Sequence, residues 1–319
     1  MAATARLAAR AYPLCRPNPG VAAILVKDGR VISRGLTQPS GRPHAEALTL
    51  EGLTDPSKPN SAAGMTMYVT LEPCAHESER GPACSHLLAT AQPDRIVVGQ
   101  LDPDPRTNGQ GIERLRKAGI EVVLLEDDAS RKSLRGFLTR QTLGRPHVTL
   151  KLATSLDGQI AMADGNSQWI TGDMARAHVH AQRARQDAIL VGGGTWRDDK
   201  PRLDVRLPGL EERSPDRVLL SRGVAPDGVR VINEPAQINS LDGVQALYLE
   251  GGAEAAASFL AEDLVDEIHL YRAPIVIGRG RSALGDIGLE ALEDAHGRWA
   301  LAETRQLGSD TFTSYVRTR

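Results

Sequence analysis

One histidine and two cysteines constrain the fold of this chain more than any other feature, because the distant segments that carry them must meet at one point. The segment Pro43-His44-Ala45-Glu46 is followed about 30 residues later by Pro73-Cys74, and Cys84 comes ten positions after that. An imidazole and two thiolates are preferred ligands of tetrahedral zinc. With three protein ligands, the ion keeps a fourth position for water and lowers the pKa of that water to about 7. We therefore expect His44, Cys74 and Cys84 to bind Zn²⁺.

The carboxylate of Glu46 comes two residues after the predicted histidine ligand. Hydrolysis at such an ion needs a group, not itself a ligand, that carries a proton from the attacking water to the leaving group. His-x-Glu, then Pro-Cys, then a third ligand is the pattern of zinc-dependent deaminases, although the loop before Cys84 is longer than in its short form. Residues two apart on a helix do not share a face, so we expect His44 and Glu46 at the start of a helix, with Pro43 at its entrance.

Each part of this pattern also has a plainer interpretation. A lone His-x-Glu arises by chance, and a cysteine after a proline is often a small buried apolar side chain. The zinc could also be structural, in a non-catalytic protein whose second half only binds a nucleotide. A structural zinc site does not require a carboxylate such as Glu46 beside it, so the full combination favours catalysis.

The composition excludes several classes of partner. The 319 residues are enough for two domains. With 38 basic and 40 acidic residues and 3% aromatic residues, the chain lacks the basic excess and the stacking platforms typical of nucleic-acid binding. No apolar run approaches the roughly 18 residues that span a bilayer. We expect a cytoplasmic enzyme that acts on a small molecule, binds neither nucleic acid nor membrane, and forms a homo-oligomer.

The cysteine count and the first residues add two smaller expectations. Three cysteines leave Cys15 over once two are assigned to zinc, so we expect no disulfide framework and a structural role for Cys15. Residues 1–12 are rich in Ala and Arg and superficially suggest a transit peptide, but a short amphipathic helix fits better because Pro13 and a strand follow at once.

Hydrophobic runs and turn signals predict an α/β layered domain in the N-terminal half. The expected elements are strands at 21–26 and 31–32 around a hairpin at 27–30, a helix at 43–53, a strand at 67–71, a helix at 84–91, a strand at 95–99, a helix at 109–118 and a strand at 121–125. The strand at 67–71 would deliver Cys74 to the edge where open α/β sheets bind ligands. Asn18, between two prolines, is either a turn residue or a hydrogen-bonding partner for a pyrimidine.

The C-terminal half predicts a second α/β domain. Residues 126–146 look like a solvated, charged helix that leads to a linker, with a boundary near 145. Beyond it, apolar runs predict strands at 148–153, 188–191 and 246–249, and Gly251-Gly252 precedes a helix at 253–262. Glycines between a strand and a helix let a phosphate approach the positive helix end. This favours a nucleotide site, although the sequence has neither a Gly-x-Gly-x-x-Gly fingerprint nor a Walker loop.

A longer series of motifs runs through both halves. In the first half the motifs are Pro17-Asn18-Pro19, Pro43-His44-Ala45-Glu46, the run from Thr70 to His76, Asp102-Pro103-Asp104-Pro105 and Gly111-Ile112. In the second half they are the run from Lys151 to Gly158, Trp169-Ile170-Thr171-Gly172, Val191 to Thr195 with Asp199, Pro201 to Arg206, Leu249 to Gly252, residues 264–267 and Ala273-Pro274. In this order the motifs resemble those of the bifunctional deaminase-reductases of riboflavin biosynthesis. The resemblance implies a cytidine-deaminase-like α/β/α domain at residues 1–145 and a dihydrofolate-reductase-like α/β domain, which uses NADPH, at residues 146–319.

The resemblance also implies roles for individual residues. Zinc would be bound by His44, Cys74 and Cys84, with Glu46 as the proton shuttle. The residues implied to contact NADPH are Ala153, Trp169, Thr195, Asp199 and Gly252. The residues implied to contact substrate are Asn18, His76, Lys151, Ser167, Arg183, Leu203, Arg206 and Glu250. The cationic members of this set suit a ribose phosphate, whereas without the resemblance the two arginines would be taken for solvated surface residues.

The implied reactions are successive. The first domain would deaminate 2,5-diamino-6-(5-phosphoribosylamino)pyrimidin-4-one with zinc-activated water, and the second would reduce the ribosyl side chain to ribityl with hydride from NADPH. The alternative is a zinc deaminase of another base or nucleoside, with a nucleotide-binding accessory domain.

Three departures from the family pattern bear on whether both activities are retained. They are the loop from Glu77 to Arg80, Asp104 where asparagine is usual, and Lys200 where aspartate is usual. A carboxylate at position 104 would repel a substrate phosphate. We expect either that Arg80 compensates for Asp104 or that the deaminase pocket differs in detail.

Overall fold

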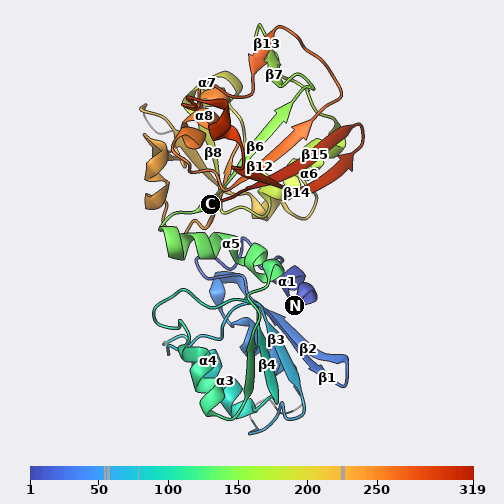
Figure 1. Cartoon of the computed structure of the whole chain (residues 1–319), viewed down its shortest axis with the longest axis vertical. Helices are drawn as coiled ribbons and strands as arrows, with labels where there is room; N and C mark the ends of the chain where they lie inside the picture. The colour runs from blue at the N-terminus through green and yellow to red at the C-terminus, as the bar shows by residue number, and fades with distance from the viewer. Residues whose placement is uncertain (54, 56–57, 78, 224–226) are drawn as a thin grey trace. The chain divides into compact units, whose positions relative to one another are not determined.

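The structure is a computed structural model that describes residues 1–53, 55, 58–77, 79–223 and 227–319. The chain divides into two compact units, Met1–Gly144 and Arg145–Arg319. Figure 1 labels the elements of both units, which are described separately below. Among the described residues, no helix is both long and apolar enough to cross a membrane.

Within the described residues of the first unit, five strands form one mixed sheet in the order β2-β1-β3-β4-β5. The strands are β1 (Ala22–Lys27), β2 (Arg30–Leu36), β3 (Thr66–Val69), β4 (Arg95–Val98) and β5 (Glu121–Leu124). β1 runs antiparallel to β2 and β3, whereas β3, β4 and β5 are parallel. Asp28 and Gly29 form the tight turn between β1 and β2 with φ values of 48° and 72°, as the favoured two-residue hairpin requires.

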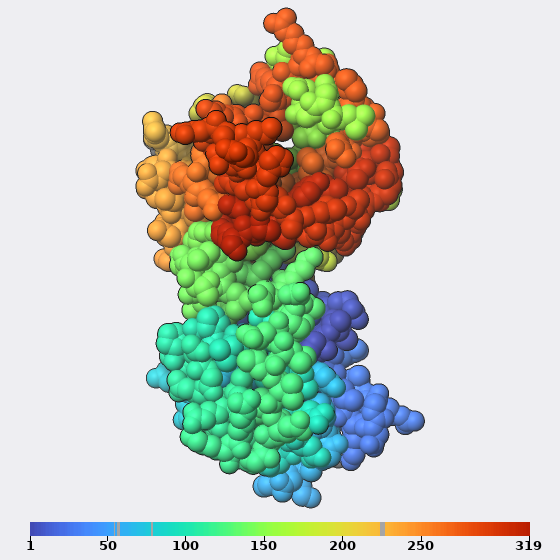
Figure 2. All heavy atoms as spheres, in the orientation of Figure 1, coloured from blue at the N-terminus to red at the C-terminus, as the bar shows by residue number. Residues whose placement is uncertain are grey.

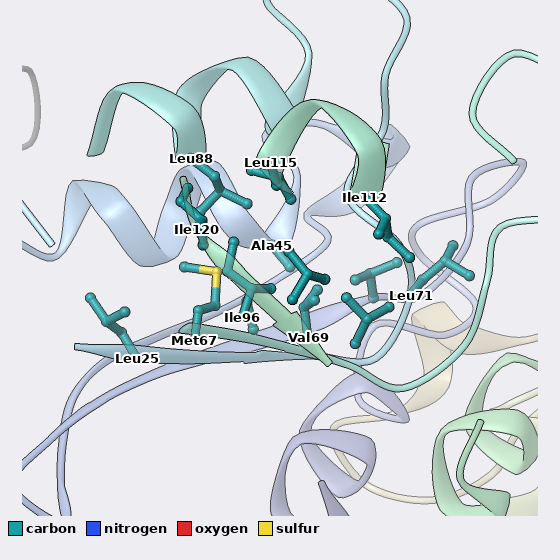
Figure 3. Close-up of a cluster of buried hydrophobic side chains, with 14 of the residues drawn as sticks. Leu25, Ala45, Met67, Val69, Leu71, Leu88, Ile96, Ile112, Leu115 and Ile120 are labelled. Carbon is teal, nitrogen blue, oxygen red and sulfur yellow. The ribbon is translucent and has the colours of Figure 1, made fainter. Parts of the chain in front are cut away.

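Helices cover both faces of this sheet. They are α1 (Ala2–Ala8), α2 (Ala45–Glu51), α3 (Cys84–Ala91), α4 (Gln110–Lys117) and α5 (Asp128–Leu143), with a short 3₁₀ turn at Pro39–Gly41. Consecutive residues of β1 and β4 are buried, which means that neither face of these strands is open to solvent. Figure 3 shows side chains of α2, α3 and α4 packed on the sheet; the labelled residues are Leu25, Ala45, Met67, Val69, Leu71, Leu88, Ile96, Ile112, Leu115 and Ile120.

The expected elements of this half are confirmed to within a few residues, with two corrections. Helix α2 begins at Ala45 and His44 is its N-cap, so Pro43 lies before the helix and not at its first position. The segment 126–146 is not only a solvated connection, because Leu134 and Phe137 of α5 are buried in the core of the unit. Leu134 and Phe137 are three residues apart, which is the spacing of one helix face. The many charged residues around them make this apolar face hard to recognise in the sequence.

Within the described residues of the second unit, eight strands form a sheet in the order β10-β9-β8-β11-β6-β12-β15-β14. Its strands are β6 (His147–Thr154), β8 (Ala188–Gly192), β9 (Asp216–Leu220), β10 (Arg230–Ile232), β11 (Ala246–Leu249), β12 (Glu267–Arg272), β14 (Trp299–Leu307) and β15 (Asp310–Arg317). The strands from β10 to β12 are parallel, and β15 and β14 add an antiparallel edge. The strands β7 (Gln159–Met162) and β13 (Gly280–Ser282) pair separately and project from this unit in Figures 1 and 2.

Three helices accompany the second sheet in the described residues: α6 (Asp173–Arg183), α7 (Gly193–Asp199) and α8 (Ala253–Ala261). Short 3₁₀ turns lie at Glu211–Arg213, Pro235–Ser240 and Leu292–Ala295. One apolar cluster joins α8 to the sheet through Phe259, and a separate cluster joins α6 through Val179. Because side chains alternate along a strand, Lys151 of β6 faces away from the fully buried Leu150. The predicted α/β class is confirmed for both halves.

Candidate functional site

The predicted zinc ligands lie together in the first unit. Among the residues that the structure describes, His44, Cys74 and Cys84 form a group whose ligand atoms all lie within 4.8 Å of one another. His44 Nδ1 is 3.3 Å from Cys84 Sγ and 3.6 Å from Cys74 Sγ. A tetrahedral ion with ordinary zinc bond lengths holds its nitrogen and sulfur ligands about 3.6 Å apart. The donor set and its spacing therefore fit Zn²⁺.

The ligands come from two helix starts and one strand end. His44 is the N-cap of α2, Cys84 is the first residue of α3, and Cys74 lies on the loop that follows β3. Helix N-termini carry a partial positive charge that favours a thiolate. The backbone N–H of Cys84 lies 3.3 Å from Cys74 Sγ, and hydrogen bonds from Cys84 and His44 outweigh burial to lower the pKa of the Cys74 thiol. The Cys74 sulfur is thus favoured in the charged form that binds a metal, whereas its hydrogen bond to Cys84 and burial raise the pKa of the Cys84 thiol.

The carboxylate of Glu46 lies beside the cluster without being part of it. Glu46 is in the first turn of α2 and its side chain is buried, with only 3% of the residue exposed. Burial raises the pKa of Glu46 to about 7, although the nearby His44 acts in the opposite direction. A group whose pKa is close to the working pH both accepts and releases a proton readily, as general acid/base catalysis requires.

Other predicted contacts of the deaminase half border the metal segment. A Cβ atom at Gly41, three residues before His44, would lie only 1.7 Å from Asn18 Nδ2, so the Asn18 amide rests on this glycine. His76 is partly exposed, and its Nδ1 lies 3.5 Å from the buried Thr107 Oγ1. Cys15 is fully buried with Ala11 and Tyr12, in agreement with a structural role.

In the second unit, the predicted substrate contacts Lys151, Arg183 and Glu250 form an ion-pair cluster. Arg183 donates to Glu250 through Nε at 2.6 Å and Nη2 at 2.9 Å, and Lys151 Nζ is 3.8 Å from Glu250 Oε2. Burial would raise the pKa of Glu250, but the two cations lower it, with Arg183 the stronger. Burial lowers the pKa of Lys151 despite Glu250. The cluster carries one more positive than negative charge, which suits an anionic ligand.

Two predicted cofactor contacts meet where parallel strands end. The backbone N–H of Gly252 donates to Thr195 Oγ1 at 3.0 Å, which joins the N-terminal turns of α7 and α8. These helices follow the neighbouring strands β8 and β11. Helix starts at the carboxyl ends of parallel strands are favourable sites for phosphate groups. Asp199 is exposed at the last position of α7, and Ala153 lies near the end of β6.

The remaining predicted residues are spread over nearby loops. Ser167 and Trp169 lie between β7 and α6; Trp169 is 65% exposed, and the Arg176 guanidinium lies 4.8 Å from its ring centroid. Leu203 is buried and has a positive φ of 55°. Arg206 is half exposed and lines a surface hollow with Arg202, Asp204, Val205, Pro208, Glu211 and Ser214.

Comparisons with known proteins find relatives of both halves of the chain. Residues 1–100 match the family described as the cytidine and deoxycytidylate deaminase zinc-binding region, and residues 146–313 match the RibD C-terminal domain. The riboflavin biosynthesis protein RibD of Escherichia coli is 35% identical over 363 aligned positions, which cover 97% of this chain and 96% of that protein. The chain belongs to the RibD family. RibD of Aquifex aeolicus is also 35% identical, over 88% of this chain and 87% of that protein.

Solved structures of RibD proteins support the same assignment along the whole chain. RibD of Acinetobacter baumannii matches with a TM-score of 0.87 and 34% identity, over 99% of this chain and 97% of that one. A Thermotoga maritima protein titled diaminohydroxyphosphoribosylaminopyrimidine deaminase/5-amino-6-(5-phosphoribosylamino)uracil reductase matches with a TM-score of 0.86 and 30% identity, over the same shares. The chain therefore carries both the zinc-binding deaminase region and the RibD reductase domain.

The structure also locates the departures from the RibD pattern. Asp104 pairs with Arg106 at 2.5 Å, and this hydrogen bond lowers the pKa of Asp104. Arg80 instead donates to the carbonyl of Ser40 at 2.8 Å, so the cation that neutralises Asp104 is Arg106 and not Arg80. Ser78, within the atypical loop, lies outside the described residues. Lys200 caps the end of α7 in a left-handed conformation and is exposed.

Two buried carboxylates next to the zinc cluster, Glu72 and Asp102, had no role predicted from the sequence. Glu72 is 2% exposed and Asp102 is 7% exposed. Burial raises the pKa of Asp102 to about 7, and the charges of Asp104 and Glu72 contribute in the same direction. The available signal was the position of these acidic residues three and four residues after two apolar parallel strands, where a buried charged side chain needs a specific partner.

Proposed function

We propose that this chain carries out two successive steps of riboflavin biosynthesis. The unit Met1–Gly144 deaminates 2,5-diamino-6-(5-phosphoribosylamino)pyrimidin-4-one, and the unit Arg145–Arg319 reduces the ribosyl side chain of the product to ribityl with NADPH. The observation that carries the proposal is the cluster of His44, Cys74 and Cys84 with the buried, uncoordinated Glu46 beside it. The homo-oligomeric state and the cytoplasmic location stay predictions.

In the deaminase unit, His44, Cys74 and Cys84 would hold Zn²⁺, which would supply an activated water as nucleophile. Glu46 would accept a proton from that water and pass it to the departing amino group, so that water and the C(NH₂)=N unit of the ring become a C(=O)–NH unit and ammonia. The pKa of about 7 suits both transfers. Asn18 and His76, which border the metal segment, orient the pyrimidine ring for attack.

In the reductase unit, NADPH supplies the hydride that converts the ribosyl group into ribityl. The Gly252 turn, held to Thr195 by its own N–H, would place the start of α8 toward the phosphates of the cofactor. The excess positive charge around Glu250 attracts the substrate phosphate, while the bidentate bond from Arg183 keeps this cluster in one arrangement. Ala153, near the end of β6, and Trp169, on the segment between β7 and α6, would contact the cofactor.

Glu46→Gln tests the deaminase proposal most directly. The variant keeps the size of the side chain but removes the proton carrier, so ammonia release should fall by about 10²- to 10⁴-fold while bound zinc stays at one ion per chain. Glu51→Gln, at the exposed end of the same helix, is the matched control and should keep full activity. If Glu46→Gln released ammonia at the wild-type rate with zinc bound, the catalytic assignment would be wrong.

A further inference from the structure

Glu72 is a buried carboxylate that the proposed reactions do not use. It lies two residues before Cys74 and is 2% exposed. Its Oε2 accepts hydrogen bonds from the backbone N–H groups of Gly109 at 2.9 Å and Asp102 at 3.3 Å, and its Oε1 accepts from Ile112 at 3.1 Å. A buried carboxylate is expensive unless such donors satisfy it. One side chain on the loop after β3 thus binds both ends of the segment 102–112.

Through these bonds Glu72 caps helix α4 from a distant part of the sequence. Gly109 is the N-cap of α4 with a φ of 83° and has no side chain to cap its own helix, and Ile112 is in the first turn. Free N–H groups at a helix start need acceptors, and the partial positive charge there favours a carboxylate. Glu72 supplies the acceptor atoms that the N-cap Gly109 lacks, and it adds a buried negative charge at this end of α4.

The start of α4 also lies directly against the peptide that precedes the zinc ligand. A Cβ atom at Gly111 would be 2.1 Å from the carbonyl oxygen of Pro73, a distance at which real Cβ atoms are not found. Only glycine therefore allows α4 to approach Pro73 this closely. The cap and the close approach together fix the backbone between Glu72 and Cys74.

Further bonds hold the other side of Cys74 to the same helix. Arg114 of α4 donates to Ser85 Oγ at 2.9 Å, and Ser85 Oγ donates to the carbonyl of Cys74 at 2.9 Å. The N–H of Ala75 lies 3.4 Å from Thr107 Oγ1, on the segment that leads into α4. The loop with the zinc ligand is therefore tied to α4 both before and after the cysteine.

We infer that Glu72 is a positioning residue for the metal centre, which docks α4 onto the Pro73-Cys74 peptide and so fixes the direction of the Cys74 thiolate. The inference rests on the proposed function only in taking the His44, Cys74 and Cys84 cluster as the zinc site. Groups that orient metal ligands from behind typically contribute about 10- to 100-fold to metal affinity or activity. Glu72 does not bond to a ligand side chain. It acts on Cys74 through helix α4 and the backbone of the Pro73-Cys74 peptide.

Glu72→Gln tests the inference because it keeps the volume but replaces one acceptor oxygen with an NH₂ donor and removes the charge. At least one N–H group of α4 then faces a donor. We expect the zinc dissociation constant, measured by competition with a chromophoric chelator, to rise about 10- to 100-fold. Amide hydrogen exchange of Gly109 and Ile112 should accelerate, whereas amides of β4 should keep their protection. Gly111→Ala, which separates α4 from Pro73 with Glu72 intact, should weaken zinc binding in the same direction.

The control is Glu113→Gln, which removes a carboxylate from the same first turn. Glu113 pairs with Lys117 on the exposed face, and its side chain is 63% exposed, so zinc affinity should not change. Glu72 is not a positioning residue if zinc affinity of Glu72→Gln stays within about twofold of wild type. Loss of protection in β4 as well as α4 would also overturn the inference, because Glu72 would then support the whole unit. These readouts need no substrate, so they stand apart from the outcome of Glu46→Gln.

Discussion

Asp266 should make a large, pH-dependent contribution to the stability of the reductase unit. It directly precedes β12, and its Oδ2 accepts from Arg145 Nη1 at 2.7 Å and from the N–H of Val148 at 2.8 Å. Its Oδ1 accepts from Arg145 Nη2 at 2.9 Å. The side chains of Arg145 and Asp266 are 10% and 8% exposed, so solvent screens this pair little. The bonds tie the first residues of the unit to its central strands.

The magnitude follows from the pKa of Asp266. Burial acts to raise this pKa, but the hydrogen bonds from Arg145 and the neighbouring charges lower it from 3.8 to about 2. A depression of nearly two pKa units corresponds to about 2 kcal/mol in favour of the ionised, folded form. Because the folded pKa is the lower one, this stability is fully present above about pH 4. It is lost as the pH falls from about 4 to about 2.

Asp266→Asn imitates the protonated carboxyl group and should lower the free energy of unfolding by about 2 kcal/mol at pH 7. The difference in free energy of unfolding between variant and wild type should shrink to about 1 kcal/mol near pH 3. At that pH the wild-type Asp266 is mostly protonated in the unfolded chain but mostly ionised in the folded protein. Urea unfolding followed by tryptophan fluorescence measures this directly, because Trp169, Trp196 and Trp299 all belong to the second unit. The urea concentration at the unfolding midpoint is compared between wild type and variant at pH 7 and at pH 3.

Asp242→Asn is the control for this experiment, since Asp242 is exposed and a surface substitution of this kind changes stability by less than about 0.5 kcal/mol. The reasoning is refuted if Asp266→Asn unfolds at the same urea concentration as this control. A difference from wild type that is as large at pH 3 as at pH 7 would also refute it, because the effect would then not come from the charge.

Two further predictions use the separate activities of the units. Glu250→Gln breaks the buried pair with Arg183 and should lower the free energy of unfolding of the reductase unit by about 3–5 kcal/mol. Most NADPH oxidation should be lost, with ammonia release unchanged. An unchanged urea midpoint, measured by tryptophan fluorescence, would contradict this. Removal of zinc by a chelator should abolish ammonia release but leave NADPH oxidation of the deaminated substrate within about twofold, and added Zn²⁺ should restore the first activity. Parallel loss of both activities would show that the metal supports more than the deaminase site.

The zinc site could be predicted from the sequence because its ligands are of few residue types and lie beside a recognisable helix start and strand end. His44 and Glu46 were placed at a helix start, and the structure puts His44 at the N-cap and Glu46 in the first turn of α2. Cys74 follows a recognisable apolar strand. Zinc accepts few kinds of ligand, so their order and spacing carried the interpretation even before the fold was known.

The pairing of charges could not be predicted because it depends on contacts between distant segments. Arg183, at the end of α6, is 67 positions from Glu250, and no local pattern indicates that their side chains meet. Arg80 was one of two alternatives for Asp104, the other being a pocket that differs in detail, and the structure instead pairs Asp104 with Arg106, only two residues away. The sequence of helix α5 predicts a solvated helix because charged residues dominate it, whereas the structure buries Leu134 and Phe137 on one of its faces.

The role of Glu72 shows the same limit within the deaminase half. The sequence places Glu72 after a predicted strand, but the carboxylate oxygens of Glu72 accept hydrogen bonds from the backbone amides of Asp102 and Ile112, 30 and 40 residues further along the chain. Similarly, Gly111 was noted as part of a family motif, whereas the reason for a glycine there is the carbonyl of Pro73. Such close approaches arise only when the helix and the loop are packed together.

The central claim is that one chain first deaminates and then reduces the same phosphoribosylaminopyrimidine. The most direct measurement incubates the zinc-loaded protein with 2,5-diamino-6-(5-phosphoribosylamino)pyrimidin-4-one, with and without NADPH, and follows ammonia and NADPH together. We expect ammonia release in both cases, and NADPH oxidation that begins only after ammonia has appeared. Failure to release ammonia, or NADPH oxidation that precedes it, would contradict the account.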